Sequence, residues 1–379
     1  MSSDDITATT SKHLRHIPLS YNNADSQTSA LRLILTLYPD WEHDDGKIEF
    51  VRFTDGITNT LLKAVKRRPG CTDEQIDEGA VLLRAYGKGT EVLIDREKEA
   101  TSHSLLSQHG LAPSLLARFQ NGLIYRFIRG RDAGPEIPLY SSVPKSLPSL
   151  ETINAITPGK PTPNVWTIMQ KWAFALPTDN KAQVIRKDVL QKELERTVSD
   201  LGDLPGLGGN GLVFGHTDLL SGNVIVQPRT TIDRDSKVET VCFIDYEYAV
   251  PSPAAFDIAN HFAEWGGFTC DFSVLPTRSM RQGFVEEYIQ SYASHSHLKT
   301  NDTMASRLFD EIDAFRGVPG LYWGIWALIQ ATISQIDFDY AAYAEVRLGE
   351  YWAWRAEEDG SRAKDGKEKP LRERRWAEE

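Results

Sequence analysis

Two polar side chains in one short loop have the types and the spacing to carry chemistry. Asp218 and Asn223 stand five positions apart, between the apolar runs 212–214 and 224–226. An aspartate can take the proton of a hydroxyl group, and the amide oxygen of an asparagine is a hard ligand that suits Mg²⁺. This spacing is typical of the catalytic loop of phosphoryl-transfer enzymes. The loop therefore predicts a catalytic base at Asp218 and a metal ligand at Asn223.

A second acid follows about twenty residues later. Residues 241–244 are apolar, as expected of a buried strand, and the strand ends in Asp245. This is the position of the metal-binding aspartate that follows the catalytic loop in kinases. Taken alone, either acid is ordinarily a loop or strand-end residue. The order of strand, loop, strand and acid nevertheless predicts a Mg²⁺ site on Asn223 and Asp245.

Earlier segments could contact a nucleotide. The segment 54–59 joins two strand-like runs, so backbone N–H groups could approach phosphate oxygens there, although an ordinary hairpin turn is the alternative. Its residues of interest are Gly56, Thr58 and Asn59. Arg84 ends the apolar run 81–84, where protein kinases carry a phosphate-contacting lysine. Glu99 follows 15 residues later as its ion-pair partner; two unrelated surface charges are the alternative.

Aromatic residues gather near the C-terminal end of the sequence. Trp323, Trp326 and Gln330 share one helical face, which is more often core than ligand site. Cations bind over aromatic rings that lie beside a carboxylate. Together with the acid Glu264 and further aromatic residues, this face therefore suggests a binding site for a cation. These further residues are Phe338, Tyr340 and Tyr343.

Composition limits the class of protein. The chain has 379 residues, of which 41% are hydrophobic and 25% charged, as in a globular protein of more than one lobe. Its net charge of −11 argues against nucleic-acid binding through phosphate neutralisation. Three widely spaced cysteines fit a reducing, cytoplasmic location, and the absence of an 18-residue apolar run argues against membrane insertion. The oligomeric state stays open, a homodimer included.

Periodicity predicts an α+β organisation in four parts. Residues 1–28 are expected to be a flexible tail, and 356–379 a charged, disordered tail. Residues 29–130 are expected to form a small N-lobe, and residues 131–355 a larger, mainly helical C-lobe after a proline-rich stretch at 132–163. The N-lobe should hold an antiparallel sheet of strands 48–53, 60–66, 80–86 and 122–128, with helices at 29–38 and 95–106. C-lobe helices are expected at 165–176, 187–201, 278–293, 304–315 and 322–333.

Several of these segments together resemble one family. They are Gly215-His216-Thr217-Asp218 with Asn223, the run from Ile244 through Tyr248 with 256–265, and Trp323-Gly324-Ile325-Trp326-Ala327. In these segments the chain resembles the choline and ethanolamine kinase family over residues 51–351. The resemblance implies a bilobal, protein-kinase-like fold with ATP and Mg²⁺ bound between the lobes. It also implies phosphorylation of ethanolamine to phosphoethanolamine, the first step of phosphatidylethanolamine synthesis.

The resemblance also assigns roles to residues. Asp218 would be the base, Asn223 and Asp245 the Mg²⁺ ligands, and Arg84 with Glu99 the pair that positions the nucleotide. Phe127 and Ile128 would lie at the hinge near adenine, and the segment 54–59 would be the phosphate loop. The amino-alcohol pocket would consist of Tyr248, Glu264, Trp323, Trp326, Phe338 and Tyr343. One departure is Thr217, where the family usually has asparagine.

The choice of substrate rests on smaller signs. The strings at 54–59, 326–331 and 336–340 resemble ethanolamine kinases more than choline kinases. An ethanolamine ammonium has N–H donors that need an acceptor such as Glu264, whereas a trimethylammonium group is satisfied by aromatic faces. Ethanolamine is therefore the preferred hypothesis, with choline or dual specificity as the alternative. An aminoglycoside-type phosphotransferase and a non-catalytic scaffold are more distant alternatives.

Overall fold

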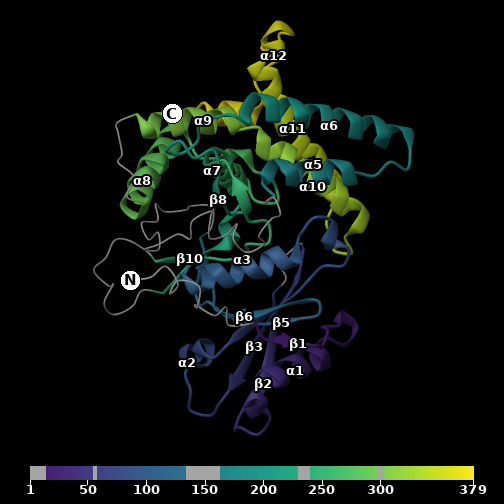
Figure 1. The fold of residues 1–379 in the computed structure, drawn as a ribbon, viewed down its shortest axis with the longest axis vertical. Helices are drawn as coiled ribbons and strands as arrows, with labels where there is room; N and C mark the ends of the chain where they lie inside the picture. Colours follow the sequence, from purple (N-terminus) through teal and green to yellow (C-terminus); the bar gives the residue numbers. More distant parts are fainter. Residues whose placement is uncertain (1–13, 54–57, 134–162, 229–239, 297–302) are drawn as a thin grey trace, which may run out of the picture. The chain divides into compact units, whose positions relative to one another are not determined.

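The chain forms two compact units. The structure, a computed structural model, describes residues 14–53, 58–133, 163–228, 240–296 and 303–379 (Figure 1). By their contacts, residues 1–87 and 113–127 form the first unit, and residues 88–112 and 128–379 form the second. The last crossing between the units falls between Phe127 and Ile128, at the expected hinge.

A six-stranded sheet is the framework of the first unit. Its order is β1-β5-β6-β4-β3-β2, and every neighbouring pair is antiparallel except β1 and β5, which run parallel. The expectation of a purely antiparallel sheet is corrected at this edge. Arg84 lies on β4 inside the sheet, opposite Leu61 and Leu123. The strands are β1 (His16–Ile17), β2 (Lys47–Phe53), β3 (Thr60–Arg67), β4 (Val81–Ala85), β5 (Leu115–Phe119) and β6 (Gly122–Arg126).

Helix α1 (Ser26–Leu37) packs on this sheet through one apolar face. Its buried Leu33, Ile34 and Leu37 recur at helical spacing and share a core with strand residues such as Leu83 and Ile124. The other short helical elements of the unit are η1 (Asn23–Asp25), η2 (Pro39–Glu42) and α2 (Asp73–Glu78).

The prediction of a flexible tail at residues 1–28 is wrong for residues 14–28. Ile17 is fully buried on β1, and the side chain of Asn121 holds the backbone of Tyr21 in both directions. Its Oδ1 accepts from the Tyr21 N–H at 2.9 Å, and its Nδ2 donates to the Tyr21 carbonyl at 3.0 Å. These long-range bonds order a segment whose composition alone suggests a flexible chain. Residues 1–13 lie outside the described part.

The second unit is mainly helical. Its helices are α3 (Arg96–Gln108), α5 (Val165–Ala175), α6 (Lys181–Leu201), α7 (Ala254–Ala263), α8 (Arg278–Ser296), α9 (Met304–Phe315), α10 (Val318–Ile333), α11 (Tyr340–Glu358), α12 (Ser361–Lys364) and α13 (Leu371–Trp376). Its 3-10 turns are η3 (Thr90–Val92), η4 (Ser221–Asn223), η5 (Glu264–Gly266) and η6 (Phe272–Val274). The antiparallel sheet β10-β9-β7 contains β7 (Arg131–Asp132), β9 (Val224–Val226) and β10 (Val241–Phe243). A two-stranded sheet contains β8 (Val213–Gly215) and β11 (Val250–Ser252).

Helix α3 packs with the second unit, although the sequence analysis places it in the small lobe. Tyr246 donates its hydroxyl proton to the carbonyl of Leu111 at 2.7 Å, and the Trp172 indole donates to the carbonyl of Leu93 at 3.1 Å. These buried bonds fix both flanks of the helix. Sequence position alone does not reveal them, because each joins residues far apart in the chain.

Helices α10 and α11 lie side by side in close contact (Figure 1). A Cβ on Gly320 would come within 2.4 Å of the Arg347 carbonyl oxygen, and one on Gly324 within 2.6 Å of the Leu348 side chain. Because residues four apart share a helix face, the two glycines form one contact strip. This strip sets how close the aromatic side chains of α10 come to those of α11.

The C-terminal residues 356–379 are ordered, so the expectation of a disordered tail is wrong. Trp376 is buried on α13, and its indole donates to Asp313 Oδ1 at 2.7 Å. The Arg281 guanidinium stacks over the Trp376 ring at 4.0 Å and donates to its carbonyl oxygen. Charge-rich composition suggests disorder only while the charges lack partners, and here they find them.

Two expectations fall partly outside the described residues. The proline-rich stretch is described only at its ends, since 134–162 lie outside, and so do residues 54–57 of the proposed phosphate loop, Gly56 included. Within the described part of the chain, no helix has both the length and the apolarity to cross a membrane.

The packing of α13 predicts a specific loss of stability. Trp376→Ala should lower the free energy of unfolding by about 3 kcal/mol, because it removes a buried ring together with its stacking contact to Arg281. Chemical denaturation measures the change. Leu371→Ala, on the exposed side of the same helix, is the matched control and should change stability by less than about 0.5 kcal/mol. Equal stability of Trp376→Ala and the parent chain would show that this helix is not packed.

Candidate active site

Asp218 and Asn223 meet within one buried loop between β8 and β9. Each is only 8% exposed. The Asn223 Nδ2 donates to the Asp218 carbonyl oxygen at 2.7 Å and lies 3.4 Å from its carboxylate Oδ2. The predicted base and the predicted metal ligand are therefore neighbours. Because its amide nitrogen is engaged in this way, Asn223 can offer Oδ1 to a cation.

Asp245 reaches the same loop through a strand ladder. Antiparallel strands β9 and β10 pair Val224 with Phe243, and the next step is a hydrogen bond from the Ile244 N–H to the Asn223 carbonyl at 3.0 Å. Asp245 follows directly, with a positive φ of 65° that few non-glycine residues adopt. The register thus brings the three sequence-predicted residues to one end of the sheet.

Asp257 on α7 holds the backbone of the loop. Its carboxylate accepts the N–H groups of His216 at 3.0 Å and Thr217 at 2.7 Å. Burial raises the pKa of Asp257 to about 6, although both N–H bonds act to lower it. Thr217 also has a positive φ of 58°, which is strained for a β-branched residue, and its hydroxyl donates to the Tyr248 carbonyl at 2.7 Å. The family's usual asparagine tolerates this conformation more easily, so Thr217 relies on these bonds.

Two buried histidines tie the loop to its neighbours. His216 Nε2 lies 2.9 Å from the Ile244 carbonyl, and His261 Nδ1 lies 2.6 Å from the Leu219 carbonyl. Burial lowers the pKa of His216 to about 4, so its ring is neutral near pH 7. A carbonyl oxygen only accepts, so the nitrogen beside it carries the proton in each ring. Both histidines therefore act as structural donors and not as bases.

The aromatic residues form one cluster in the same unit. The Trp326 indole donates to the Tyr248 hydroxyl at 2.8 Å, and the Trp323 ring packs edge-on against Tyr248 and Trp326, with centroids at 5.6 and 5.4 Å. Tyr340 and Phe338 continue the series from Trp326, and Phe338 packs against Tyr343 at 5.6 Å. The structure thus brings all five aromatic residues of the predicted pocket together, with Tyr340 between them.

Asn260 joins this cluster to the catalytic loop. Its Nδ2 donates to the Thr217 carbonyl at 3.0 Å, and its Oδ1 accepts from the Trp323 indole at 2.8 Å. No role was predicted for Asn260 or Asp257, although both stand in the run 256–265 on which the family resemblance rests. Their three-residue spacing on a helix could have indicated a shared face toward the loop.

Glu264 follows Asn260 by one helical turn and is buried with a partner. It is 3% exposed, and the guanidinium of Arg347 on α11 donates to its Oε1 at 2.8 Å. Burial raises the pKa of Glu264, and Arg347 opposes that rise. The predicted acceptor for an ammonium group is therefore already engaged at one oxygen. The sequence analysis missed Arg347, whose only signal is its position four residues after Tyr343.

The predicted nucleotide residues are divided between the units. Arg84 is buried in the first unit, where Thr58 and Asn59 directly precede β3. Glu99 belongs to the second unit and accepts from Arg96 at 2.9 Å, and Arg96 also pairs with Glu247 at 2.9 Å. The pairing of Arg84 with Glu99 stays a prediction, as does the contact of Phe127 and Ile128 with adenine.

The donor set fits a hard divalent cation. Asn223 and Asp245 offer amide and carboxylate oxygens, the ligand types that Mg²⁺ prefers. In the described ranges no three His, Cys, Asp or Glu side chains converge as a metal site. Asn223 and Asp245 would hold such an ion through one amide and one carboxylate oxygen.

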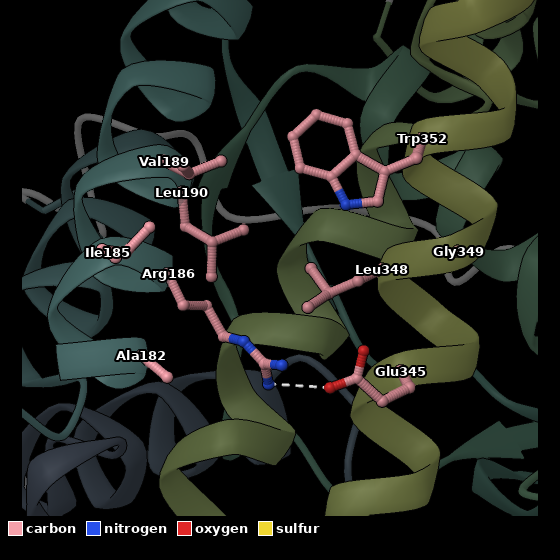
Figure 2. Close-up of a pocket in the computed structure, with 9 residues that line it drawn as sticks. All are labelled: Ala182, Ile185, Arg186, Val189, Leu190, Glu345, Leu348, Gly349 and Trp352. Carbon is pink, nitrogen blue, oxygen red and sulfur yellow. Dashed lines mark ion pairs between the residues drawn. The ribbon is translucent and has the colours of Figure 1, made fainter. Parts of the chain in front are cut away.

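A separate hollow lies between α6 and α11 (Figure 2). Its volume is about 540 Å³, and its wall is largely apolar, with an ion pair of 2.7 Å between Arg186 and Glu345. Ile185, Val189 and Trp352 contribute to this wall. None of the predicted site residues lines it, so it is distinct from the candidate active site.

Comparisons with known proteins find one family for this chain. The family model of choline/ethanolamine kinases matches residues 50–352. Ethanolamine kinase 2 of Mus musculus is 35% identical over 338 residues, which is 86% of this chain and 81% of the relative. A probable choline kinase 2 of Arabidopsis thaliana is 30% identical over 332 residues, 83% of this chain and 88% of the relative.

A solved structure extends the comparison to the fold. An ethanolamine kinase from Plasmodium vivax superposes with a TM-score of 0.64 at 24% identity, covering 86% of this chain and 89% of its own. This likeness confirms the protein-kinase-like fold expected from the sequence. Sequence match and fold lead to one conclusion: the chain belongs to the choline/ethanolamine kinase family.

Proposed function

We propose that the chain transfers the γ-phosphoryl group of ATP to the hydroxyl of ethanolamine, giving phosphoethanolamine for phosphatidylethanolamine synthesis. The observation that carries the proposal is Asn260, whose amide bonds both the catalytic loop and the aromatic cluster. An amino alcohol needs its hydroxyl at a base and its amine at a cation site. Asn260 holds these two sites in register.

Asp218 is the proposed base that takes the substrate proton. Asn223 steadies it through the bond to its backbone carbonyl, while Asp257 fixes the backbone on the other side. Asn223 and Asp245 would hold Mg²⁺, which neutralises charge on the phosphate oxygens when bound. The protein's own contribution is then to hold the hydroxyl and the phosphate in line in a buried loop.

The amine end is assigned to the aromatic cluster and Glu264. A cation would bind over the rings of the cluster, which are those of Tyr248, Trp323, Trp326, Phe338 and Tyr343. Arg347 engages one oxygen of Glu264, and the other oxygen can accept an ammonium N–H. This acceptor favours ethanolamine, because a trimethylammonium group has no N–H to donate. Choline remains the second candidate, since the chain also resembles a probable choline kinase.

Three further assignments complete the proposal. The proposed contacts of ATP are Gly56, Thr58, Asn59, Arg84, Glu99, Phe127 and Ile128. The cytoplasm is the proposed location, supported by three cysteines that are all free. The sequence leaves the oligomeric state open, a homodimer included.

The role of Asp218 can be tested directly. Asp218→Asn should lower kcat by about 10² to 10⁴, because the amide cannot take the hydroxyl proton, while the affinity for ATP stays near that of the parent chain. Steady-state ADP release and nucleotide titration measure the two quantities. Asp203→Asn, an exposed aspartate in a nearby loop, is the control. Parent-like turnover by Asp218→Asn would remove the base from the proposal.

The substrate can be tested with the unmodified chain. The kcat/KM obtained from Mg²⁺-dependent ADP release should be highest with ethanolamine and lower with choline. With an aminoglycoside no release should be detected. Glu264 and the ring cluster give the physical reason for that order. A higher kcat/KM for choline would reassign the substrate, and no release with any amine would indicate a non-catalytic scaffold.

A further inference from the structure

A buried row of alternating charges leads from Glu264 to the C-terminal helix α13. Arg347 donates to Glu264 at 2.8 Å and lies 3.5 Å from Glu350, and Arg372 on α13 lies 3.2 Å from the other oxygen of Glu350. Arg372 also donates to Glu373 at 3.0 Å. Each of these side chains is less than 5% exposed. The row thus joins the proposed amine site to a segment that lies beyond the family match at 50–352.

The charges of the row balance once Arg316 is included, because it pairs with Glu373 and three carboxylates then meet three guanidinium groups. Glu264 and Glu350 are both within reach of Arg347, so two buried carboxylates compete for one guanidinium. A buried charge without a partner is costly, so the second carboxylate needs a cation of its own. Arg372 supplies it. With Glu350 paired to Arg372, Arg347 can keep its shorter contact with Glu264.

Several contacts hold α13 in addition to those of Arg372. Trp376 is held by Asp313 and Arg281, and the Arg375 guanidinium donates to the Leu275 carbonyl at 2.9 Å. Glu373 has a second partner in Arg316, whose Nε donates to it at 3.1 Å. A substitution at Arg372 therefore removes its pairing with Glu350, its bonds to Glu373 and to the Arg316 carbonyl, and its contact with the Trp376 ring, while these other contacts of the helix persist.

We propose that Arg372 is a positioning residue for amine recognition: by pairing with Glu350 it keeps Arg347 on Glu264 and so fixes the carboxylate that receives the ammonium group. The inference rests on the proposed amino-alcohol substrate. It gives the C-terminal helix, which the sequence suggests is a disordered tail, a part in setting substrate affinity. In the absence of Arg372, Glu350 draws Arg347 away and Glu264 loses its fixed orientation.

The test separates positioning from folding. Arg372→Gln should raise KM for ethanolamine about tenfold, because Glu264 is then held less firmly and its hydrogen bond to the ammonium group is weakened. The kcat and the KM for ATP should change less than about twofold. The double variant Glu350→Gln with Arg372→Gln should return KM for ethanolamine to within about twofold of the parent chain. It removes both charges together, so Arg347 keeps only Glu264 as a partner. If α13 only stabilised the fold, the double variant would not restore KM for ethanolamine.

Arg375→Gln on the same helix is the matched control, because it removes an arginine of α13 outside the row, and its KM should equal that of the parent. Thermal denaturation of each variant checks folding. An unchanged KM in Arg372→Gln, or a double variant no better than the single one, overturns the inference while the parent still turns over ethanolamine or choline. A parent chain inactive with both amines overturns the proposed function instead.

Discussion

The second unit depends on one carboxylate that satisfies a loop without regular structure. Asp257 accepts the backbone N–H groups of His216 and Thr217, which neither a helix nor a strand would otherwise pair. The same helix, α7, carries Asn260 toward the loop and the Trp323 ring. The position of a single helix therefore determines where the proposed base stands relative to the proposed amine site. Strain at Thr217 persists because these bonds surround it.

The features that depend on local order along the chain could be predicted from the sequence. Asp218, Asn223 and Asp245 are separated by short strands, so the strand pattern was enough to expect them at one end of a sheet, and the ladder from Val224 to Ile244 brings them there. Helices α5, α6, α8, α9 and α10 were also predicted, because a buried helix repeats its apolar residues at a period that a single chain reveals. Helices α7, α11, α12 and α13 were not predicted. Family resemblance then added the aromatic cluster, which spacing alone would have assigned to the core.

Other features depend on partners distant in the chain, which no local pattern reveals. Arg347 reads as one more charge on an amphipathic helix until Glu264, 83 residues earlier, is placed beside it. Arg372 and Trp376 lie in a segment so rich in charge that composition predicts disorder. Their partners nevertheless come from three other helices, α8, α9 and α11. The edge strand β1 was missed for the same reason, since its two residues gain order only by pairing with β5.

The glycine strip of α10 has a consequence for how this enzyme family can diversify. A Cβ on Gly320 would meet the α11 backbone, whereas one on Gly324 would meet the Leu348 side chain, so a larger residue at position 320 would force the two backbones apart. With the amine site as proposed, a larger substrate would need smaller rings at positions such as Trp326 or Phe338, because the strip between the two helices has no room to widen.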